Sequence, residues 1–313
     1  MIVVTGGAGF IGSQIVRHLN ARGRKDIIVV DDLEDGRKAL NLADCEVVDY
    51  LDKEDFLQRI NNREKFAGNL TAVLHQGACT DTTEWDGQYM MRVNFEYSKH
   101  LLEYCANDGI PLIYASSASV YGAGTECAVE RRCENPINVY AFSKLMFDQY
   151  LRHVMPTLQS QVVGLRYFNV YGPGEAHKGG MASVVYHFHQ QLRAGDEVRL
   201  FVGCEGYDDG EQRRDFVYVD DIAAVNLWML EHPECSGIFN LGTGVSRSFN
   251  DVAKAVIQWH GRGHIKYIPF PEQLVGSYQS FTESDLSTLR AAGCEHEFLP
   301  VEEGVKRYLD RIG

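Results

Sequence analysis

A glycine-rich turn near the start of the chain constrains the fold more than any other feature. A short apolar run at residues 2–4 leads into Gly6, Gly9 and Gly12, spaced three apart, and an amphipathic stretch follows over 13–22. In such a strand–turn–helix unit, the glycines permit a tight turn, close approach of a pyrophosphate to the backbone, and close packing of helix on strand. The helix N-terminus adds unpaired N–H groups and the positive end of the helix dipole. The pattern predicts a dinucleotide cradle rather than a purely structural turn.

Short apolar runs alternate with longer amphipathic stretches through the first half of the chain. Five runs are predicted strands: residues 2–4, 27–30, 72–74, 112–114 and 162–165. Continuous apolar strands separated by helices are typical of a parallel sheet that is covered on both faces. We therefore predict an α/β fold, a Rossmann-type doubly wound parallel sheet.

The second half is predicted to form a smaller C-terminal substrate lobe that interleaves with the sheet. A helix is expected over 181–194 and a strand over 199–202, and the apolar runs at 216–219 and 238–241 are expected to rejoin the large sheet. The predicted domains are a dinucleotide-binding domain, residues 1–168 plus about 214–242, and a substrate-binding lobe, about 169–213 plus 243–313.

Charge and composition argue against several classes of partner. The formal net charge of -13 opposes binding to a phosphate backbone, and no stretch approaches the roughly 20 apolar residues of a membrane span. The 8 cysteines are scattered, with no Cys-x-x-Cys pair, so we expect reduced thiols and no bound metal. The expected location is the cytoplasm, without nucleic acid or membrane partners.

Asp31 and Asp32 follow the glycine turn by about twenty residues, at the end of the second predicted strand. A carboxylate at this position accepts hydrogen bonds from the adenosine ribose, which favours NAD. Arg37 and Lys38 follow closely, and a cation there offsets the charge of the 2′-phosphate of NADP. The alternative is that both cations belong to a solvated loop, so the residues alone leave the choice of cofactor open.

A tyrosine and a lysine four residues apart supply candidate acid–base chemistry. Tyr140 and Lys144 would lie one turn apart on one face of a helix. A tyrosine titrates near pH 10, and a neighbouring ammonium together with a nicotinamide cation would lower this pKa. Ser117 ends the strand at 112–114, at the carboxyl edge where open α/β sheets bind ligands.

Four motifs in this order resemble the extended short-chain dehydrogenase/reductases. They are Gly6-x-x-Gly9-x-x-Gly12, Ser117-x-x-Val120-Tyr121-Gly122, Tyr140-x-x-x-Lys144 and the segment 166–173. The resemblance implies that Ser117, Tyr140 and Lys144 are catalytic. It implies cofactor contacts from Gly6, Gly9, Phe10, Ile11, Gly12, Asp31, Asp32, Lys38, Lys53, Gln76, Gly77, Ala78, Cys79, Asn94, Lys144 and Val170.

Further segments, at 84–87, 177–183, 213–219 and 268–271, are similar to the branch of this family that epimerises an ADP-linked glycero-manno-heptose at C6. The likeness implies a transient 6-ketone made by tightly bound NADP, with NAD possible, a role in supplying heptose to the lipopolysaccharide core, and a homopentamer. It also implies that Tyr140 and Lys178 are the two acid–base groups. On residue type alone, a lysine in a glycine-flanked loop such as Lys178 is more often solvated.

The same resemblance implies a set of substrate-binding residues. Arg214 suits a diphosphate because a guanidinium binds two phosphate oxygens at once, whereas His187 taken alone is equally well a surface histidine. The set comprises Ser117, Asn169, Lys178, His187, Phe201, Val202, Gly203, Cys204, Arg214 and Tyr278.

The sequence departs from the family pattern at two places. Asp32 stands where the branch usually has asparagine, which puts the preference for NADP in doubt, and the segment 206–212 is longer than usual. The alternatives are another nucleotide-sugar epimerase, such as a UDP-hexose 4-epimerase, or a non-catalytic NAD(P)-sensing protein. A sugar-nucleotide dehydratase is disfavoured because Ala118 and Ser119 do not supply the acid–base pair that elimination needs.

Overall fold

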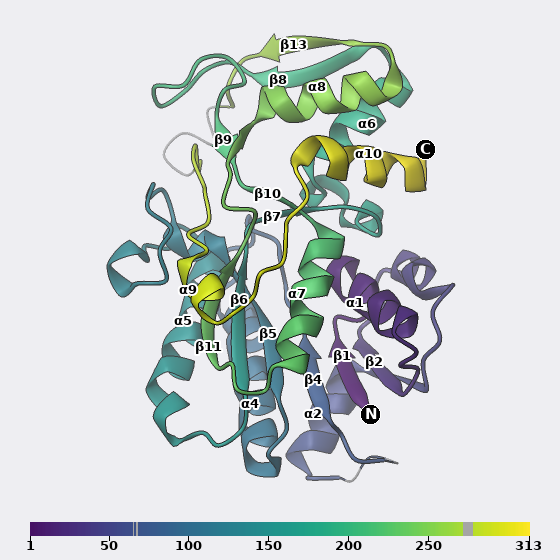
Figure 1. The fold of residues 1–313 in the computed structure, drawn as a ribbon, viewed down its shortest axis with the longest axis vertical. Helices are drawn as coiled ribbons and strands as arrows, with labels where there is room; N and C mark the ends of the chain where they lie inside the picture. Colours follow the sequence, from purple (N-terminus) through teal and green to yellow (C-terminus); the bar gives the residue numbers. More distant parts are fainter. Residues whose placement is uncertain (65, 67, 272–277) are drawn as a thin grey trace.

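A seven-stranded parallel sheet forms the centre of the larger part of the molecule (Figure 1). The computed structural model describes residues 1–64, 66, 68–271 and 278–313. The strand order is β11-β6-β5-β4-β1-β2-β3, which places the first strand inside the sheet and the connections on both faces. The strands are β1 (Ile2–Thr5), β2 (Ile27–Asp31), β3 (Asp49–Asp52), β4 (Ala72–His75), β5 (Leu112–Ser117), β6 (Val162–Tyr167) and β11 (Gly237–Leu241). This order confirms the predicted Rossmann-type sheet.

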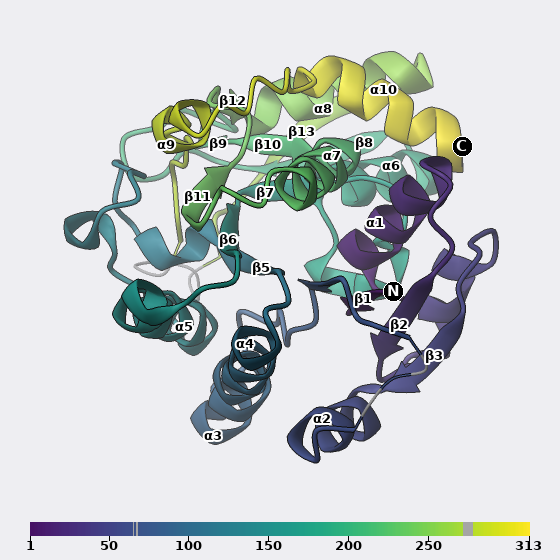
Figure 2. The ribbon, with the colours of Figure 1, turned by 60° about the horizontal axis from the view of Figure 1, so that its bottom comes forward.

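Helices cover both faces of this sheet (Figure 2), because alternate strand residues point to opposite sides. Val4 belongs to the apolar cluster that includes residues of α1 (Phe10–Ala21) and α7 (Val219–Glu231). Val3 belongs to the opposite cluster, with residues of α2 (Lys53–Asn61), α4 (Tyr97–Asp108) and α5 (Val139–Val154). Between β4 and α4 lie α3 (Gly87–Met90) and a π-helical turn, Met91–Glu96.

The remaining elements build a smaller layer around a third apolar cluster, beyond the carboxyl ends of the strands. Three two-stranded sheets contribute: β7 (Asn169–Tyr171) with β10 (Phe216–Tyr218), β8 (Glu197–Phe201) with β13 (His264–Ile268), and β9 (Arg213–Arg214) with β12 (Arg247–Ser248). The helices of this layer are α6 (Val184–Ala194), α8 (Phe249–His260) and α10 (Val301–Ile312), whereas α9 (Ser287–Ala291) packs against the large sheet, in the cluster of α1 and α7. Short 3-10 segments complete the chain: Gly36–Leu42, Ala118–Tyr121, Arg131–Cys133, Met155–Thr157 and Ala176–Met181.

Three details differ from the sequence-based expectations. The strand at 216–218 does not rejoin the large sheet but pairs with β7, whereas β11 does join it, beside β6. The edge strand β3 was not predicted, because three of its four residues are at least partly exposed and form no apolar run. Helix α1 begins at Phe10, inside the glycine turn, rather than at residue 13.

All eight cysteines are free thiols. Within the described part of the chain, no helix is long and apolar enough to cross a membrane, and no group of three or more potential ligands could hold a metal ion.

Candidate active site

The glycine turn is a compact backbone loop between β1 and α1. Gly6 has a φ of +62°, and a Cβ on Gly12 would lie 2.1 Å from the Gly6 carbonyl oxygen. Gly9 caps α1, so the N-terminus of the helix opens directly onto the turn. A cavity of about 260 Å³ lies above it. A bare backbone at a helix N-terminus fits the pyrophosphate of a dinucleotide, and added side chains would fill the space.

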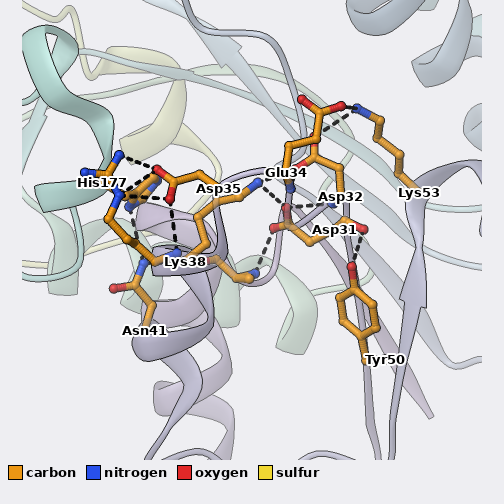
Figure 3. Close-up of polar contacts among 11 residues, drawn as sticks. Asp31, Asp32, Glu34, Asp35, Lys38, Asn41, Tyr50, Lys53 and His177 are labelled. Atoms are coloured by element: carbon orange, nitrogen blue, oxygen red, sulfur yellow. Dashed lines mark hydrogen bonds and ion pairs between the residues drawn. The ribbon is translucent and has the colours of Figure 1, made fainter.

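Two aspartates and two lysines form an ionic cluster at the end of β2 (Figure 3). Asp31 Oδ2 accepts a hydrogen bond from the Ala8 amide at 2.9 Å, which fixes the carboxylate against the glycine turn. Lys38 Nζ lies 2.6 Å from Asp31 Oδ1 and 2.5 Å from Asp32 Oδ1, and Lys53 Nζ lies 2.8 Å from Asp32 Oδ2. Burial opposes ionisation of Asp32, but the hydrogen bonds from Lys38 and Lys53 outweigh it, so the pKa of Asp32 is lowered.

The basic residues that line the cavity near this cluster are not all those expected from the sequence. Arg37 is exposed and pairs with Asp35, so it does not line the cavity. His177 does line it, and its ring lies 3.5 Å from the Asn41 amide. The sequence analysis noted His177 only as part of the segment 177–183 and did not predict that it lines the cofactor cavity.

Most of the predicted cofactor residues line this cavity: Gly6, Gly9, Phe10, Ile11, Gly12, Asp31, Asp32, Lys38, Lys53, Gln76, Gly77, Ala78 and Cys79. Thr5, Val30, Thr80, Tyr89, Val93 and Tyr97 also line it and were not predicted. Asn94 does not; its amide instead bonds the backbone N–H and carbonyl of Cys79 and the Ser143 hydroxyl. Asn94 therefore holds one wall of the cavity in place. Lys144 and Val170 line the neighbouring cavity.

The neighbouring cavity, of about 510 Å³, brings the predicted catalytic residues together. Ser117 reaches it from the end of β5, Tyr140 and Lys144 from one face of α5, and Lys178 from the 3-10 segment after β7. Lys178 lines both cavities, so the two spaces adjoin. Lys144 Nζ donates a hydrogen bond to the Ala115 carbonyl at 2.9 Å.

Burial changes the acidity of these groups. It lowers the pKa of Lys144 to about 8, against the opposing charge of Asp148. Burial raises the pKa of Tyr140, and the Ser117 side chain offsets this only in part. In the protein without cofactor, desolvation of the phenolate therefore dominates the pKa of Tyr140, and the Lys144 ammonium is directed at a backbone carbonyl. The lowered pKa expected with both Lys144 and a nicotinamide cation stays a prediction.

Lys178 lies over the ring of Phe10, with Nζ 5.5 Å from its centroid. Burial lowers the pKa of Lys178, and the negative charge of Glu175 opposes the shift. Lys178 is therefore a partly desolvated amine in the cavity and not the solvated loop residue that its local sequence allows.

Arg214 presents a buried guanidinium to the same cavity. It stacks over the ring of Tyr278 at 4.9 Å and donates one hydrogen bond to the Arg213 carbonyl. Among the residues that the structure places, no carboxylate lies within ion-pair distance of Arg214. A buried cation that pairs with no carboxylate of the described residues suits an anionic ligand such as a diphosphate.

The other predicted substrate residues divide into two groups. Asn169, Phe201 and Tyr278 line the cavity, whereas His187, Val202, Gly203 and Cys204 do not. His187 bonds the Gly180 carbonyl, and Val202, Gly203 and Cys204 hold the segment 206–212 through Gln212 and Asp209. Lining residues that were not predicted include Thr82, Phe168, Met181, Val184, Phe216 and Phe249. Phe168, Met181 and Phe216 lie inside the motifs quoted above, but an apolar side chain in a motif gives no sign by itself that it faces a ligand.

Comparison with known proteins places this geometry in a family. The model of the NAD dependent epimerase/dehydratase family matches residues 2–242. The chain is 61% identical over 312 residues to an ADP-L-glycero-D-manno-heptose-6-epimerase of Alkalilimnicola ehrlichii, across 100% of this chain and 97% of the relative.

Solved structures of similar fold point to the same family. The fold is similar to the Helicobacter pylori ADP-L-glycero-D-manno-heptose-6-epimerase (TM-score 0.84, 30% identity, 99% of this chain and 95% of that one). It is also similar to a UDP-glucose 4-epimerase of Thermotoga maritima with UDP-glucose (TM-score 0.80, 29% identity, 99% and 98%). With a family match over most of its length and a full-length relative at this identity, the chain belongs to the NAD-dependent epimerase/dehydratase family.

Proposed function

We propose that this protein epimerises ADP-D-glycero-D-manno-heptose at C6 to the L-glycero form, through a transient 6-ketone, and so supplies heptose for the lipopolysaccharide core. The observation that carries the proposal is a single cavity, beside the glycine cradle, that is lined by Ser117, Tyr140, Lys144, Lys178 and Arg214. The full-length similarity to the Alkalilimnicola ehrlichii enzyme supports the choice of sugar.

The residues of the cavity divide the acid–base work. When bound, the nicotinamide supplies a reversible hydride acceptor at C6. Tyr140 and Lys178 each exchange a proton with the C6 oxygen, one for each orientation of the hydroxyl, and Ser117 hydrogen-bonds that oxygen. The Lys144 cation favours the Tyr140 phenolate once the nicotinamide cation adds its charge, because two nearby positive charges oppose the effect of burial.

Recognition of the nucleotide sugar falls to residues farther along the cavity. The buried Arg214 guanidinium, with Tyr278 stacked on it, is proposed to hold the diphosphate. Asn169 and Phe201 line the same space. His187 in the first turn of α6, and Val202, Gly203 and Cys204 in the loop after β8, are also proposed to approach the substrate.

The cofactor is proposed to be NADP, with NAD also accepted. Lys38, Lys53 and His177 lie where they could meet a 2′-phosphate, and these residues together with the bare glycine turn fit a dinucleotide. Asp32, which binds both lysines, would repel that phosphate and accept the 2′-hydroxyl of NAD. We also propose a cytoplasmic homo-oligomer, a pentamer by family resemblance.

The function is tested by incubating the purified protein with either ADP-heptose epimer, without added oxidant. Interconversion should proceed while absorbance in the reduced-nicotinamide band stays flat, since the hydride returns within one active site. Stoichiometric accumulation of reduced cofactor would indicate a dehydrogenase. Turnover of UDP-hexoses but not of the heptose would indicate a 4-epimerase, and cofactor binding without any turnover would indicate a sensor.

A further inference from the structure

A buried ionic network begins on α5 one helical turn beyond Lys144. Asp148 and Arg166 are both 0% exposed, and the Glu134 side chain is equally buried. Arg166 binds Asp148 at 2.8 Å and Glu134 at 2.5 Å, and Arg152 binds Glu134 at 2.6 Å. The more exposed Arg131 lies 3.9 Å from Glu134, so three guanidinium groups surround the two carboxylates. Removing one partner of a buried pair leaves an uncompensated charge, so such a network holds its elements in one arrangement.

Asp148 connects this network to the strand that carries Ser117. Its Oδ1 accepts a hydrogen bond from the Tyr114 hydroxyl at 2.8 Å, and its Oδ2 accepts one from the Ser116 hydroxyl at 3.0 Å. Gly164 lies opposite Tyr114 in the sheet, and a Cβ there would lie 2.4 Å from the Tyr114 hydroxyl. The neighbouring strand thus leaves room for the hydroxyl that reaches Asp148.

The position of Asp148 on α5 gives it a second effect. It follows Lys144 by one helical turn and Tyr140 by two, so the three side chains share one face. The charged and titratable groups around Lys144 are Tyr140 and Asp148 from its own helix, with His75 and Cys79 from β4 and the loop after it. Burial disfavours the ammonium form of Lys144, and the negative charge of Asp148 is the largest influence that favours it.

We propose that Asp148 is a positioning residue for the reaction: it holds α5 against β5, so that Tyr140 and Lys144 face Ser117, and it places a negative charge one helical turn from Lys144. The inference rests on the proposed function only for its kinetic consequences. The effect on Lys144 is a property of the protein without substrate.

Glu134 offers a matched control. It is a fully buried carboxylate on the same Arg166 guanidinium, but it is not among the groups that act on Lys144. Asp148→Asn and Glu134→Gln are nearly isosteric, and each removes one negative charge from the network. A purely structural role would make the two variants alike, whereas the proposal makes them differ at Lys144.

The test follows the titration of Lys144 by NMR, in protein labelled with ¹³C at lysine Cε. The resonance is identified by its absence from Lys144→Arg. The midpoint should lie near 8 in the unchanged protein, fall by about one pH unit in Asp148→Asn, as expected for loss of a nearby buried charge, and stay within a few tenths of a unit in Glu134→Gln. An unchanged midpoint in Asp148→Asn, or equal shifts in both variants, would overturn the proposal. Because no substrate is present, this outcome is independent of whether the protein acts on ADP-heptose.

Kinetics tests the positioning part. In Asp148→Asn, kcat should fall about 10- to 100-fold with little change in KM, since misplaced catalytic groups cost rate rather than binding. The alkaline limb of its pH profile should move to lower pH. If this variant does not fold, Tyr114→Phe replaces it, because it removes one donor to Asp148 and no charge. Tyr114→Phe should lower kcat while the Lys144 midpoint stays unchanged, and a kcat equal to that of the unchanged protein would overturn the positioning role.

Discussion

Tyr140 and Lys178 reach the same cavity from different elements, one from α5 and one from the segment after β7. If each serves one orientation of the C6 hydroxyl, Tyr140→Phe and Lys178→Met should each lower epimerisation by about 10²–10⁴-fold, because the full reaction needs both groups. Both variants should fold and retain cofactor, since the glycine turn and the Asp32 cluster are untouched. The measurement is turnover of ADP-heptose, with bound nicotinamide assayed in parallel.

A half reaction distinguishes a mechanism with two acid–base groups from a mechanism with one. An aldehyde analogue of the substrate can be oxidised and reduced at one carbon, and each variant should still disproportionate it with its remaining base. Near-normal epimerisation by Lys178→Met would mean that the ketone rotates within the site and that Tyr140 alone serves both orientations.

Asp32 is the residue on which the choice of cofactor depends. Asp32→Asn should strengthen NADP binding relative to NAD by about tenfold or more, because it removes a negative charge beside the 2′ position and frees Lys38 and Lys53 for the phosphate. Isothermal titration on protein stripped of cofactor gives both affinities. Glu34→Gln is the control: Glu34 is 82% exposed and 3.9 Å from Lys53, so its removal should change the ratio less than about twofold. Equal effects of the two variants would contradict a specific role for Asp32.

At the scale of elements, the junction of β1 and α1 has little room for added atoms. In Gly12→Ala, the new Cβ would lie 2.1 Å from the Gly6 carbonyl oxygen, so the turn or the helix must shift. We expect loss of dinucleotide binding and a lower melting temperature, measured by titration and by circular dichroism. Gly36→Ala, where nothing lies within 4 Å of the new Cβ, should change neither. Normal cofactor binding by Gly12→Ala would show that the turn relaxes without consequence.

At the scale of the whole molecule, the chain passes more than once between the large sheet and the smaller layer. β11 and α7 come late in the sequence but pack with β6 and α1, and Gln14 of α1 donates a hydrogen bond to the Pro173 carbonyl in the loop that leads to Lys178. Asn41 likewise donates to the carbonyls of Ala8 and Gly174. Residues of the two predicted lobes therefore pack against and hydrogen-bond to one another.

We expect one cooperative thermal unfolding transition for this arrangement. Trp228 lies in α7, on the large sheet, and Trp259 lies in α8, in the smaller layer. Single-tryptophan variants that retain one or the other should report melting temperatures within about 1 °C of each other. Two separated transitions would show that the lobes unfold independently.

The sequence by itself determined the features that depend on neighbours along the chain. The strand β1, the glycine turn and α1 follow from local backbone constraints, and the one-turn spacing of Tyr140 and Lys144 follows from helical geometry. The alternation of apolar runs and helices was enough to predict a parallel sheet, because a strand buried on both faces must be apolar throughout.

Only the tertiary structure decided what depends on distant partners. The apolar strand β10 is locally like those of the large sheet, yet it pairs with β7, and the polar strand β3 exists because β2 offers it an edge. His177 lines the same cavity as Lys38, and Lys178 the same cavity as Tyr140, only because the segment after β7 returns to the glycine turn. Likewise, the burial that raises the pKa of Tyr140 and the contact of Asp148 with Arg166 arise from packing between elements. Desolvation and long-range ion pairs cannot be predicted from the spacing of residues along the chain, because they depend on which surfaces pack together in the folded protein.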